Sequence, residues 1–407
     1  MAKTRKQTTD EPTTKPPLPE GWKWFRFDEL AINVNDRIDD PSLAGVSHYV
    51  GLDHLDSDSL KIRRWGTPDE VEAQKLRFRK GDIIFGKRRA YQRKVGVADF
   101  DGICSAHAMV LRGNAKNLVP ELLPFFMQTD AFMDRAVAIS KGSLSPTINW
   151  PDLARQQFAM PANGTEQERC SVLLAQADTT RESYRSALAD IEKVESAFIS
   201  EVVLSSRHGG EMAAIGDDAD IAYGLTVNAD RRELEEERPY LRVANVQRNS
   251  LDLSEVKCIG ATSADLASFA LYNRDILVVE GHADPTEIGR AAMWHGEIKE
   301  CLHQNHILRI RCGESWVPEY VLMYLNSFDG CRYFRRHAKS SSGLYTINSS
   351  VLRNIRLPRL NLPTQIAVVE RFQGIETRRA ALTDHLTRLE AVKKRLLTHL
   401  LTQKVES

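Results

Sequence analysis

Residues 184–202, YRSALADIEKVESAFISEV, and residues 382–400, LTDHLTRLEAVKKRLLTHL, share one spacing of large apolar side chains. Successive apolar residues are four, three, three, four and four positions apart, and each residue of the second set lies 198 positions after its counterpart. The two sets are Tyr184, Leu188, Ile191, Val194, Phe198 and Val202, and Leu382, Leu386, Leu389, Val392, Leu396 and Leu400. This spacing places one narrow apolar stripe along a helix, as in a coiled coil. It predicts two long helices, over 164–205 and 362–407.

The two predicted helices carry opposite charge. Residues 165–204 hold eight acidic and four basic side chains, whereas residues 364–404 hold four acidic and eight basic ones. Each helix should therefore pair with the other rather than with a copy of itself. Two copies of one unit that meet through the same face imply an antiparallel pair. We predict an antiparallel coiled coil, with two independent helices as the alternative. The predicted pairing residues are Leu188, Ile191, Phe198, Leu386, Leu389 and Leu396.

The sequence before each helix is repeated as well. Five short matches occur in the same order in both halves, at offsets that drift from 191 to 199, as loop insertions would produce. They pair Tyr49–Leu52 with Tyr240–Val243, Gly81–Phe85 with Arg274–Val278, Ala106–Met109 with Asn305–Leu308, Pro120–Glu121 with Pro318–Glu319, and Thr147–Asn149 with Thr346–Asn348. The chain is therefore an internal duplication of a domain followed by a long helix.

Each copy is predicted to be a mixed domain of the α+β class. The expected strands of the first copy are residues 49–52, 83–85, 95–98 and 108–112. A helical segment follows from about 120 to 138, and strands followed by a helix favour α+β over alternating α/β units. We place the first domain at 18–163 and the second at 206–361. The Lys-, Thr- and Pro-rich residues 1–17 are predicted to form a disordered tail.

The composition is that of a globular protein without net charge. Of 407 residues, 42% are hydrophobic, and Lys plus Arg equals Asp plus Glu at 55 each. Any contact with DNA must therefore use local clusters of cations. The six cysteines form no Cys-x-x-Cys pair, which argues against a disulfide framework or a zinc knuckle. No apolar run reaches the roughly 18 residues of a membrane span, and no apolar signal region is seen. We expect a cytoplasmic protein without a membrane partner.

The order of domain, long helix, domain and long helix resembles the specificity subunit of type I restriction-modification systems. The resemblance covers about 18–404 and includes the opening Leu18–Trp24, the strand motifs Gly81–Phe85 and Gln304–Ile307, and both Thr-Ile-Asn segments. The second copy departs from the family pattern because the opening Leu-Pro-x-Gly-Trp is missing there. Its start near residue 212 is therefore less well defined.

The resemblance implies a function in DNA recognition. Two target-recognition domains would each read one half of a split double-stranded DNA site, and the paired helices would set the gap between the halves. The helices would also dock two modification subunits, which hold S-adenosylmethionine and methylate adenine, and motor-nuclease restriction subunits would join them. The chain itself would need no cofactor and would have no catalytic site. Its sequence shows neither a glycine-rich cofactor fingerprint nor an adenine methyltransferase motif.

Two local clusters of cations are the candidate DNA-binding residues. The first follows a predicted strand and consists of Lys87, Arg88, Arg89, Tyr91, Arg93 and Lys94. The equivalent stretch of the second copy, residues 280–287, is acidic. A different segment of the second copy forms a helical face that carries Arg332, Arg335, Arg336 and Lys339. Lys and Arg bind phosphates, and Arg also pairs with guanine. We predict that the two clusters contact different half-sites; solvated charged surfaces are the alternative.

Polar loops before the two Thr-Ile-Asn segments are further candidates. Ser143 and Thr147 in the first copy, and Ser342 and Tyr345 in the second, are predicted to touch phosphates or base edges. A plain surface loop is the alternative, because loops are commonly polar without binding anything.

A phosphate-binding loop and a metal site are both disfavoured. The segment from Gly81 approaches the phosphate-binding loop pattern, but Arg88 stands where that motif needs Ser or Thr. The residue types of a metal site occur at Cys301, His303, His306 and Cys312. Their irregular spacing favours packed histidines instead.

Two other functions stay open as alternatives. Asp284, Glu297 and Lys299 have the loose spacing of a magnesium-dependent nuclease, although so short a motif arises easily by chance. A coiled-coil scaffold whose globular copies bind protein would also fit the duplication. DNA recognition without catalysis is the reading we favour.

Overall fold

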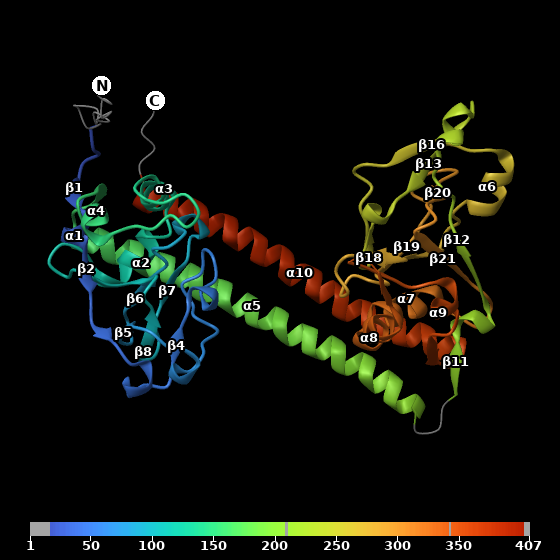
Figure 1. Ribbon diagram of the computed structural model, residues 1–407, viewed down its shortest axis with the longest axis horizontal. Coiled ribbons are helices and arrows are strands. Elements are labelled where there is room, and N and C mark those ends of the chain that lie inside the picture. Colours follow the sequence, from blue (N-terminus) through green and yellow to red (C-terminus); the bar gives the residue numbers. More distant parts are fainter. Residues whose placement is uncertain (1–16, 208–210, 342, 403–407) are drawn as a thin grey trace, which may run out of the picture. The chain divides into compact units, whose positions relative to one another are not determined.

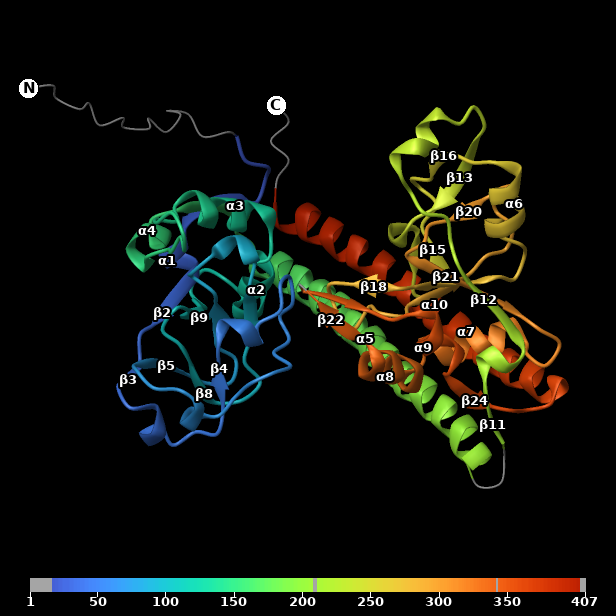
Figure 2. The same cartoon turned by 45° about the vertical axis from the view of Figure 1, so that its right-hand side comes forward.

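The computed structural model describes residues 17–207, 211–341 and 343–402. The chain forms two compact units, unit 1 from residues 1–185 and 384–407, and unit 2 from residues 186–383. The division falls inside the two long helices, α5 (Gly164–Arg207) and α10 (Leu362–Leu401), so each unit contains part of both (Figures 1 and 2). The domain limits 18–163 and 206–361 stay predictions. The predicted tail, residues 1–17, lies outside the described residues except for its last position.

Unit 1 contains two four-stranded sheets and one further strand pair. The first sheet, β2-β9-β6-β7, is antiparallel and consists of Ala31–Val34, Met109–Gly113, Ile83–Phe85 and Val95–Val97. The second, β3-β5-β8-β4, has β4 parallel to β8 and consists of Arg37–Ile38, Lys75–Phe78, Gly102–Ser105 and Tyr49–Val50. β1 (Trp22–Arg26) pairs with β10 (Gln157–Pro161), just before α5 begins. Every residue of the central β6 is buried, which explains its uninterrupted apolar sequence.

Unit 2 repeats this arrangement. The sheet β12-β21-β17-β19 is antiparallel like its counterpart and consists of Ala219–Tyr223, Ile307–Cys312, Ile276–Val279 and Ala291–Met293. β11 (Met212–Ala214) pairs with β24 (Arg356–Pro358), as β1 pairs with β10. A smaller sheet, β16-β13-β20, again contains one parallel pair and consists of Lys257–Gly260, Glu237–Leu241 and Leu302–His303. The hairpin strands β14 and β15 are Val246–Gln247 and Ser250–Leu251. The prediction of two similar α+β domains is confirmed.

Equivalent side chains fasten both long helices to their units. Near the start of α5, the side chain of Gln167 accepts a hydrogen bond from the Val119 amide at 2.7 Å. Near the start of α10, Gln365 accepts from the Val317 amide at 2.8 Å. Both glutamines are buried, and each lies 198 positions from its equivalent, as do the two valines. The repeat therefore extends to individual polar contacts.

The helix predicted from about 120 to 138 is interrupted. A 3-10 turn at Pro120–Leu122 leads into α2 (Leu123–Phe126), and α3 (Asp130–Ala138) follows after a break. The Thr129 hydroxyl donates to the Phe126 carbonyl at 2.7 Å and accepts from the Phe132 amide at 3.3 Å. The prediction of one helix was wrong because this hydroxyl ends one helix and caps the next.

Unit 2 contains the same break. Ser327 takes the place of the capping threonine between α7 (Pro318–Asn326) and α8 (Phe328–His337), and its hydroxyl accepts from the Gly330 amide at 3.2 Å. The remaining short helices are α1 (Phe27–Leu30), α4 (Trp150–Ala154), α6 (Ser263–Phe269) and α9 (Ser349–Arg353).

The long helices α5 and α10 pack against each other in both units. In unit 1, Lys393 of α10 forms an ion pair with Asp178 of α5. In unit 2, Phe372 of α10 stacks on Phe198 of α5, with 6.3 Å between ring centroids. Later positions of α5 thus meet earlier positions of α10, which confirms the predicted antiparallel pairing.

The apolar seam is less regular than the spacing predicted. Of the six predicted pairing residues, Phe198 is buried and the other five are partly buried. These five are Leu188, Ile191, Leu386, Leu389 and Leu396. Val194 and Val392, however, are 53% and 46% exposed. Their places in the core are taken by neighbouring residues, namely Ile199, Val203, Leu397 and Leu401. The predicted stripe is interrupted at these two positions, because two successive steps of three residues turn Val194 and Val392 well away from the face of Leu188 and Leu386 on a helix of 3.6 residues per turn.

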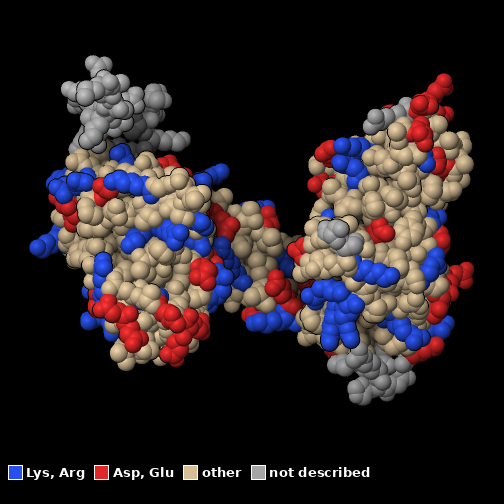
Figure 3. Space-filling view, viewed as in Figure 1, with Lys and Arg blue, Asp and Glu red and all other residues tan. Residues whose placement is uncertain are grey.

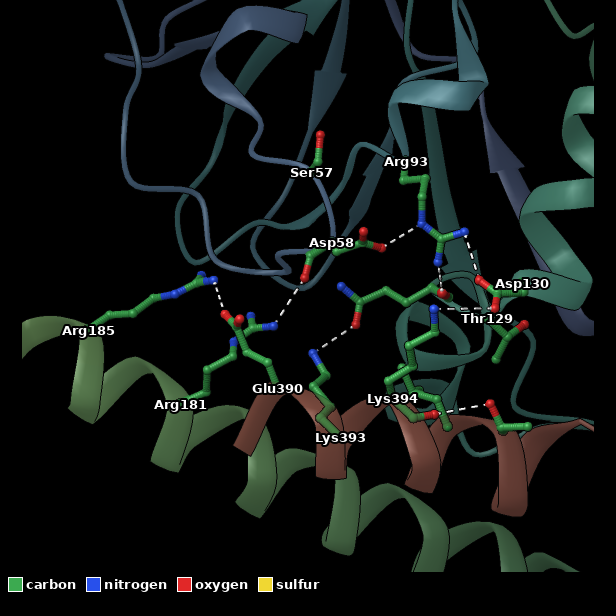
Figure 4. A pocket seen from close by; sticks show the side chains of 13 residues that line it. Ser57, Asp58, Arg93, Thr129, Asp130, Arg181, Arg185, Glu390, Lys393 and Lys394 are labelled. Atoms are coloured by element: carbon green, nitrogen blue, oxygen red, sulfur yellow. Dashed lines mark hydrogen bonds and ion pairs between the residues drawn. The ribbon is translucent and has the colours of Figure 1, made fainter. Parts of the chain in front are cut away.

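A polar cavity of about 510 Å³ lies in unit 1 between the two helices and the loops above them (Figure 4). Lys393 is 4% exposed there, and its ammonium donates to the Gln128 side chain at 2.9 Å and to Asp178. Arg181, also buried, lies 2.9 Å from Asp178 and donates to the Asp58 carbonyl at 3.1 Å. Burial lowers the pKa of Lys393, and Asp178 opposes that effect. Buried ion pairs therefore join the two helices to each other here, and buried hydrogen bonds to Gln128 and to the Asp58 carbonyl join them to the rest of unit 1.

Candidate DNA-binding surfaces

The basic segment of unit 1 leaves the end of β6 and runs beside the polar loop that precedes Thr147. The Ile148 amide donates to the Lys87 carbonyl at 3.0 Å, and Arg88 forms a β-bridge with Thr147. The structure therefore brings together a basic cluster and a polar loop that were predicted separately.

The first three cations of this segment, Lys87, Arg88 and Arg89, have no acidic ion-pair partner within the described residues. Arg88 Nη1 lies 3.1 Å from His107 Nε2, and Arg89 Nη2 lies 3.2 Å from Ser145 Oγ. Neither contact neutralises a guanidinium. The segment therefore keeps its positive charge for a ligand.

His107 is held neutral beside these cations. Burial lowers the pKa of its imidazole, and the charges of Arg88 and Lys87 lower that pKa further. An arginine can only donate, so His107 Nε2 accepts and Nδ1 carries the proton. Burial likewise lowers the pKa of Lys87. This surface is rich in hydrogen-bond donors, which suits phosphates and the acceptor edge of guanine.

Arg93 and Lys94, the last two cations of the predicted cluster, are engaged within unit 1. The Arg93 guanidinium lies 2.7 Å from Asp58 and 3.1 Å from Asp130 (Figure 4). The Lys94 ammonium donates to the Leu52 carbonyl at 2.6 Å. The structure thus does not join these two residues to the three cations before them.

The remaining candidates of unit 1 differ in accessibility. Tyr91, in the 3-10 turn Ala90–Gln92, is 54% exposed, and Ser143 is also exposed. Thr147 is half-buried and donates its hydroxyl to the Ser145 carbonyl at 3.1 Å. Thr147 therefore shapes the loop, whereas Tyr91 and Ser143 are accessible to a ligand.

In unit 2 the candidate cations lie on α8 and at the start of the following strand. Phe334 is buried beneath the helix, and the opposite side carries exposed Arg332, Arg335 and Arg336, with exposed Lys339 just after the helix. Among the described residues, no acidic side chain forms an ion pair with these four cations. Figure 3 shows Lys and Arg side chains gathered over α8. Cations near a helix C-terminus also stabilise the helix dipole, which is the purely structural alternative.

A small sheet, β18-β23-β22, continues from α8. Its strands are Gly281–His282, Leu344–Thr346 and Lys339–Ser341. Tyr345, one of the predicted site residues, is half-buried in β23. Ser342, another predicted residue, lies outside the described residues. Lys339, the last of the four cations, thus pairs within this sheet with Thr346 of the second Thr-Ile-Asn segment.

Three residues on these surfaces were missed as site residues. His107 and His306 are equivalent in the repeat, and His306 Nδ1 lies 2.8 Å from Glu280 Oε2. Glu280 follows β17 as Lys87 follows β6, and its carbonyl accepts from the Ile347 amide at 2.9 Å. The repeated His was visible in the sequence, but we interpreted it as a packed residue of the fold and not as part of a DNA-binding surface. The acidic stretch around Glu280 was set aside because it could not bind phosphate.

Three residues of the rejected catalytic and metal sites form hydrogen bonds with backbone groups instead; they are Asp284, Glu297 and His303. Asp284 accepts from the Thr286 amide at 2.8 Å, which lowers the pKa of Asp284. Glu297 accepts from the His295 amide at 2.9 Å. His303 is buried beside the Phe269 carbonyl, and burial lowers its pKa to about 4. Within the part of the chain that the structure describes, no three His, Cys, Asp or Glu side chains are grouped to hold a metal ion. Nor does any described helix have the length and apolar character needed to span a membrane.

Two curated relatives match about half of the chain. The specificity subunit of the type I restriction enzyme EcoDI from Escherichia coli is 29% identical over 204 residues, which is 49% of this chain and 44% of the relative. The putative type I restriction enzyme MjaX specificity subunit from Methanocaldococcus jannaschii is 23% identical over 188 residues, or 46% of this chain and 43% of the relative. The matches thus span less than half the length of either relative. No family model matches the chain.

Solved structures match the fold over nearly the whole chain. The S subunit of a type I restriction-modification system from M. genitalium gives a TM-score of 0.59 at 14% identity and covers 97% of this chain and 100% of its own. A chain from a structure of type I system assembly and conformational transition gives 0.58 at 18% identity, with 96% and 100% covered. At such low identity these matches establish the fold alone. They agree with the sequence relatives, however, and the predicted resemblance is confirmed: this chain is similar to the specificity subunits of type I restriction-modification systems.

Proposed function

We propose that this chain is the DNA-recognition subunit of a type I restriction-modification complex, in which each unit reads one half of a split double-stranded DNA site. The observation that carries the proposal is a repeated scaffold with different charged surfaces. Among the described residues, both units present cations without acidic partners, those of unit 1 after β6 and those of unit 2 on α8 and at Lys339. In each unit one of these cations lies beside the Thr-Ile-Asn segment, because Arg88 bridges Thr147 and Lys339 pairs with Thr346. One scaffold with two different surfaces suits two different half-sites.

The paired helices would set the gap between the half-sites and dock two modification subunits, which supply S-adenosylmethionine and methylate adenine. Motor-nuclease subunits would join this assembly. The support is the similarity to chains that are themselves named specificity subunits of type I restriction enzymes. The chain would contribute recognition and no catalysis. The candidate nuclease residues Asp284 and Glu297 each accept a hydrogen bond from a neighbouring backbone amide.

Sequencing of methylated DNA from cells with and without this gene tests the function. We expect adenine methylation at a split motif that depends on the gene. Identical methylation patterns in both strains would refute the proposed role. A gene-dependent motif that is continuous would refute the assignment of two half-sites.

The contribution of each unit is tested with the assembled complex on DNA in which one half-site is scrambled. Arg88→Ala with Arg89→Ala should weaken recognition of one half, and Arg335→Ala with Arg336→Ala recognition of the other. Each lost phosphate contact should reduce the salt dependence of binding by roughly one unit of slope. Loss of the same half by both double variants would contradict the assignment.

A matched control is the exposed Lys116→Ala. Lys116 follows the C-terminal end of β9, whereas His107 precedes the start of the same strand, so the two lie at opposite ends of it. This variant should leave both half-sites and the salt slope unchanged.

A further inference from the structure

The two units carry opposite charge at one equivalent backbone position. Lys87 follows β6 in unit 1, and Glu280 follows β17 in unit 2. Each carbonyl accepts the amide of the isoleucine in a Thr-Ile-Asn segment, from Ile148 at 3.0 Å and from Ile347 at 2.9 Å. The duplication thus preserves the backbone hydrogen bond and reverses the charge of the side chain.

A histidine lies beside this position in both units. His107 precedes β9, and His306 precedes β21, the strands that pair with β6 and β17. In unit 1 the neighbour of the histidine is a guanidinium, but in unit 2 His306 Nδ1 lies 2.8 Å from Glu280 Oε2. A carboxylate can only accept, so His306 donates and holds Glu280 in position.

Glu280 directly precedes the small sheet that also contains Lys339, one of the cations that we propose to contact phosphate. β18 follows it directly and pairs with β23, and β22 of the same sheet begins with Lys339 at the end of α8. A carboxylate on such a surface repels phosphates and weakens DNA binding unless it makes a compensating contact. Within the described residues, His306 is its ion-pair partner, and Glu280 Oε1 has no hydrogen-bond donor.

We infer that Glu280 accepts a hydrogen bond from an exocyclic amino group of a base, N4 of cytosine or N6 of adenine, in the half-site read by unit 2. These amino groups face the major groove, where carboxylates accept from them, whereas guanine and thymine present acceptors that repel a carboxylate. The inference rests on the proposed function. It makes Glu280 a specificity-determining residue and His306 the residue that positions it. Lys87, at the same place in unit 1, suits the acceptor edge of guanine.

The test is selection from a pool of randomised DNA duplexes by the full chain assembled with its modification subunits, followed by sequencing of the bound DNA. The wild type should enrich a split motif that contains cytosine or adenine at one position read by Glu280. Glu280→Ala should lower the preference at that position by about 5- to 150-fold, the range of a single base contact, and leave the other positions unchanged. Glu280→Lys should shift the preference there towards guanine. His306→Ala should weaken the preference at the same position.

Two controls separate a reading role from a structural one. Glu280→Gln preserves the shape of the side chain, so it should fold normally. It should relax the preference for cytosine. It should also tighten binding to unrelated DNA, because it removes a charge that repels phosphate. Glu314→Gln alters an exposed carboxylate after the far end of β21 and should change neither. If no Glu280 variant changes the preference at any base while the wild type enriches a motif, the inference is wrong. If the wild type enriches no motif, the proposed function itself fails.

Discussion

Replacement of Lys393 by methionine tests the buried polar contacts that join the two long helices to each other and to Gln128 of unit 1. The side chain of Lys393 is 4% exposed, and its ammonium is shared between Asp178 and the Gln128 side chain. Methionine fills nearly the same volume but can neither donate nor carry charge. The variant therefore removes the polar contacts and largely preserves the packing.

The expected loss is set by the groups left behind. Gln128 keeps a buried oxygen without its donor, which costs about 1–3 kcal/mol. Asp178 retains Arg181 at 2.9 Å, so the full cost of about 3–5 kcal/mol for an orphaned buried charge is not reached. Part of the loss is offset because burial already opposes the charge on Lys393. We expect the free energy of unfolding of unit 1 to fall by about 2–3 kcal/mol.

Urea and thermal unfolding followed by circular dichroism measure this change. For a unit of this size, the loss corresponds to a decrease in Tm of about 4–12 °C. Lys394→Met is the matched control, because the side chain of Lys394 is 75% exposed and its ammonium lies 3.9 Å from Asp130. It should change the unfolding free energy by less than about 0.5 kcal/mol. Equal effects of the two substitutions, or a clear gain in stability for Lys393→Met, would refute the reasoning.

Three further predictions concern stability and assembly. The folded-state pKa of His303 is about 4, below its ordinary 6.5, so its contribution to stability is present above pH 6.5 and lost as the pH falls towards 4. The pKa difference corresponds to about 3 kcal/mol of stability. His303→Asn, whose amide can still donate to the Phe269 carbonyl, should flatten the pH dependence of the unfolding free energy. An unaltered pH dependence would contradict the assignment. Gln365→Ala leaves the partly buried Val317 amide without its acceptor and should lower the unfolding free energy by about 1–3 kcal/mol, whereas the exposed Gln373→Ala should have little effect in the same urea titration. Leu386→Asp places a charge on the helix seam and should reduce both Tm and co-purification with modification subunits; normal assembly would show that the seam does not support docking.

The features that were predictable from the sequence are those encoded over short distances. Both long helices follow from the spacing of apolar residues, and the opposite helix charges favour the pairing of the two helices seen at Asp178 and Lys393. The duplication was visible because loop insertions shift the matches without changing their order. The buried strand at Ile83–Phe85 was predicted because its whole sequence is apolar.

The features that were missed depend on contacts between distant segments. Arg93 faces inward because Asp58, in a loop, and Asp130, at the start of α3, converge on it, and a run of cations does not reveal this. Glu280 was aligned with Lys87 in the sequence, but its contact with His306 became visible only in the structure. The broken helix after Pro120 was missed for a local reason, because the Thr129 hydroxyl interrupts a favourable helical pattern.

The division of the chain into its two units has a consequence for synthesis on the ribosome. The core of unit 1 includes Leu397 and Leu401, from the last turns of α10, whereas unit 2 is made of the continuous residues 186–383. The unit whose translation starts first is therefore completed last, after the whole of unit 2 has been made. Until then its nascent apolar surface stays uncovered, a state that favours chaperone binding and aggregation. Chains released before residue 397 should accordingly be degraded rapidly, even though nearly all of their sequence is present.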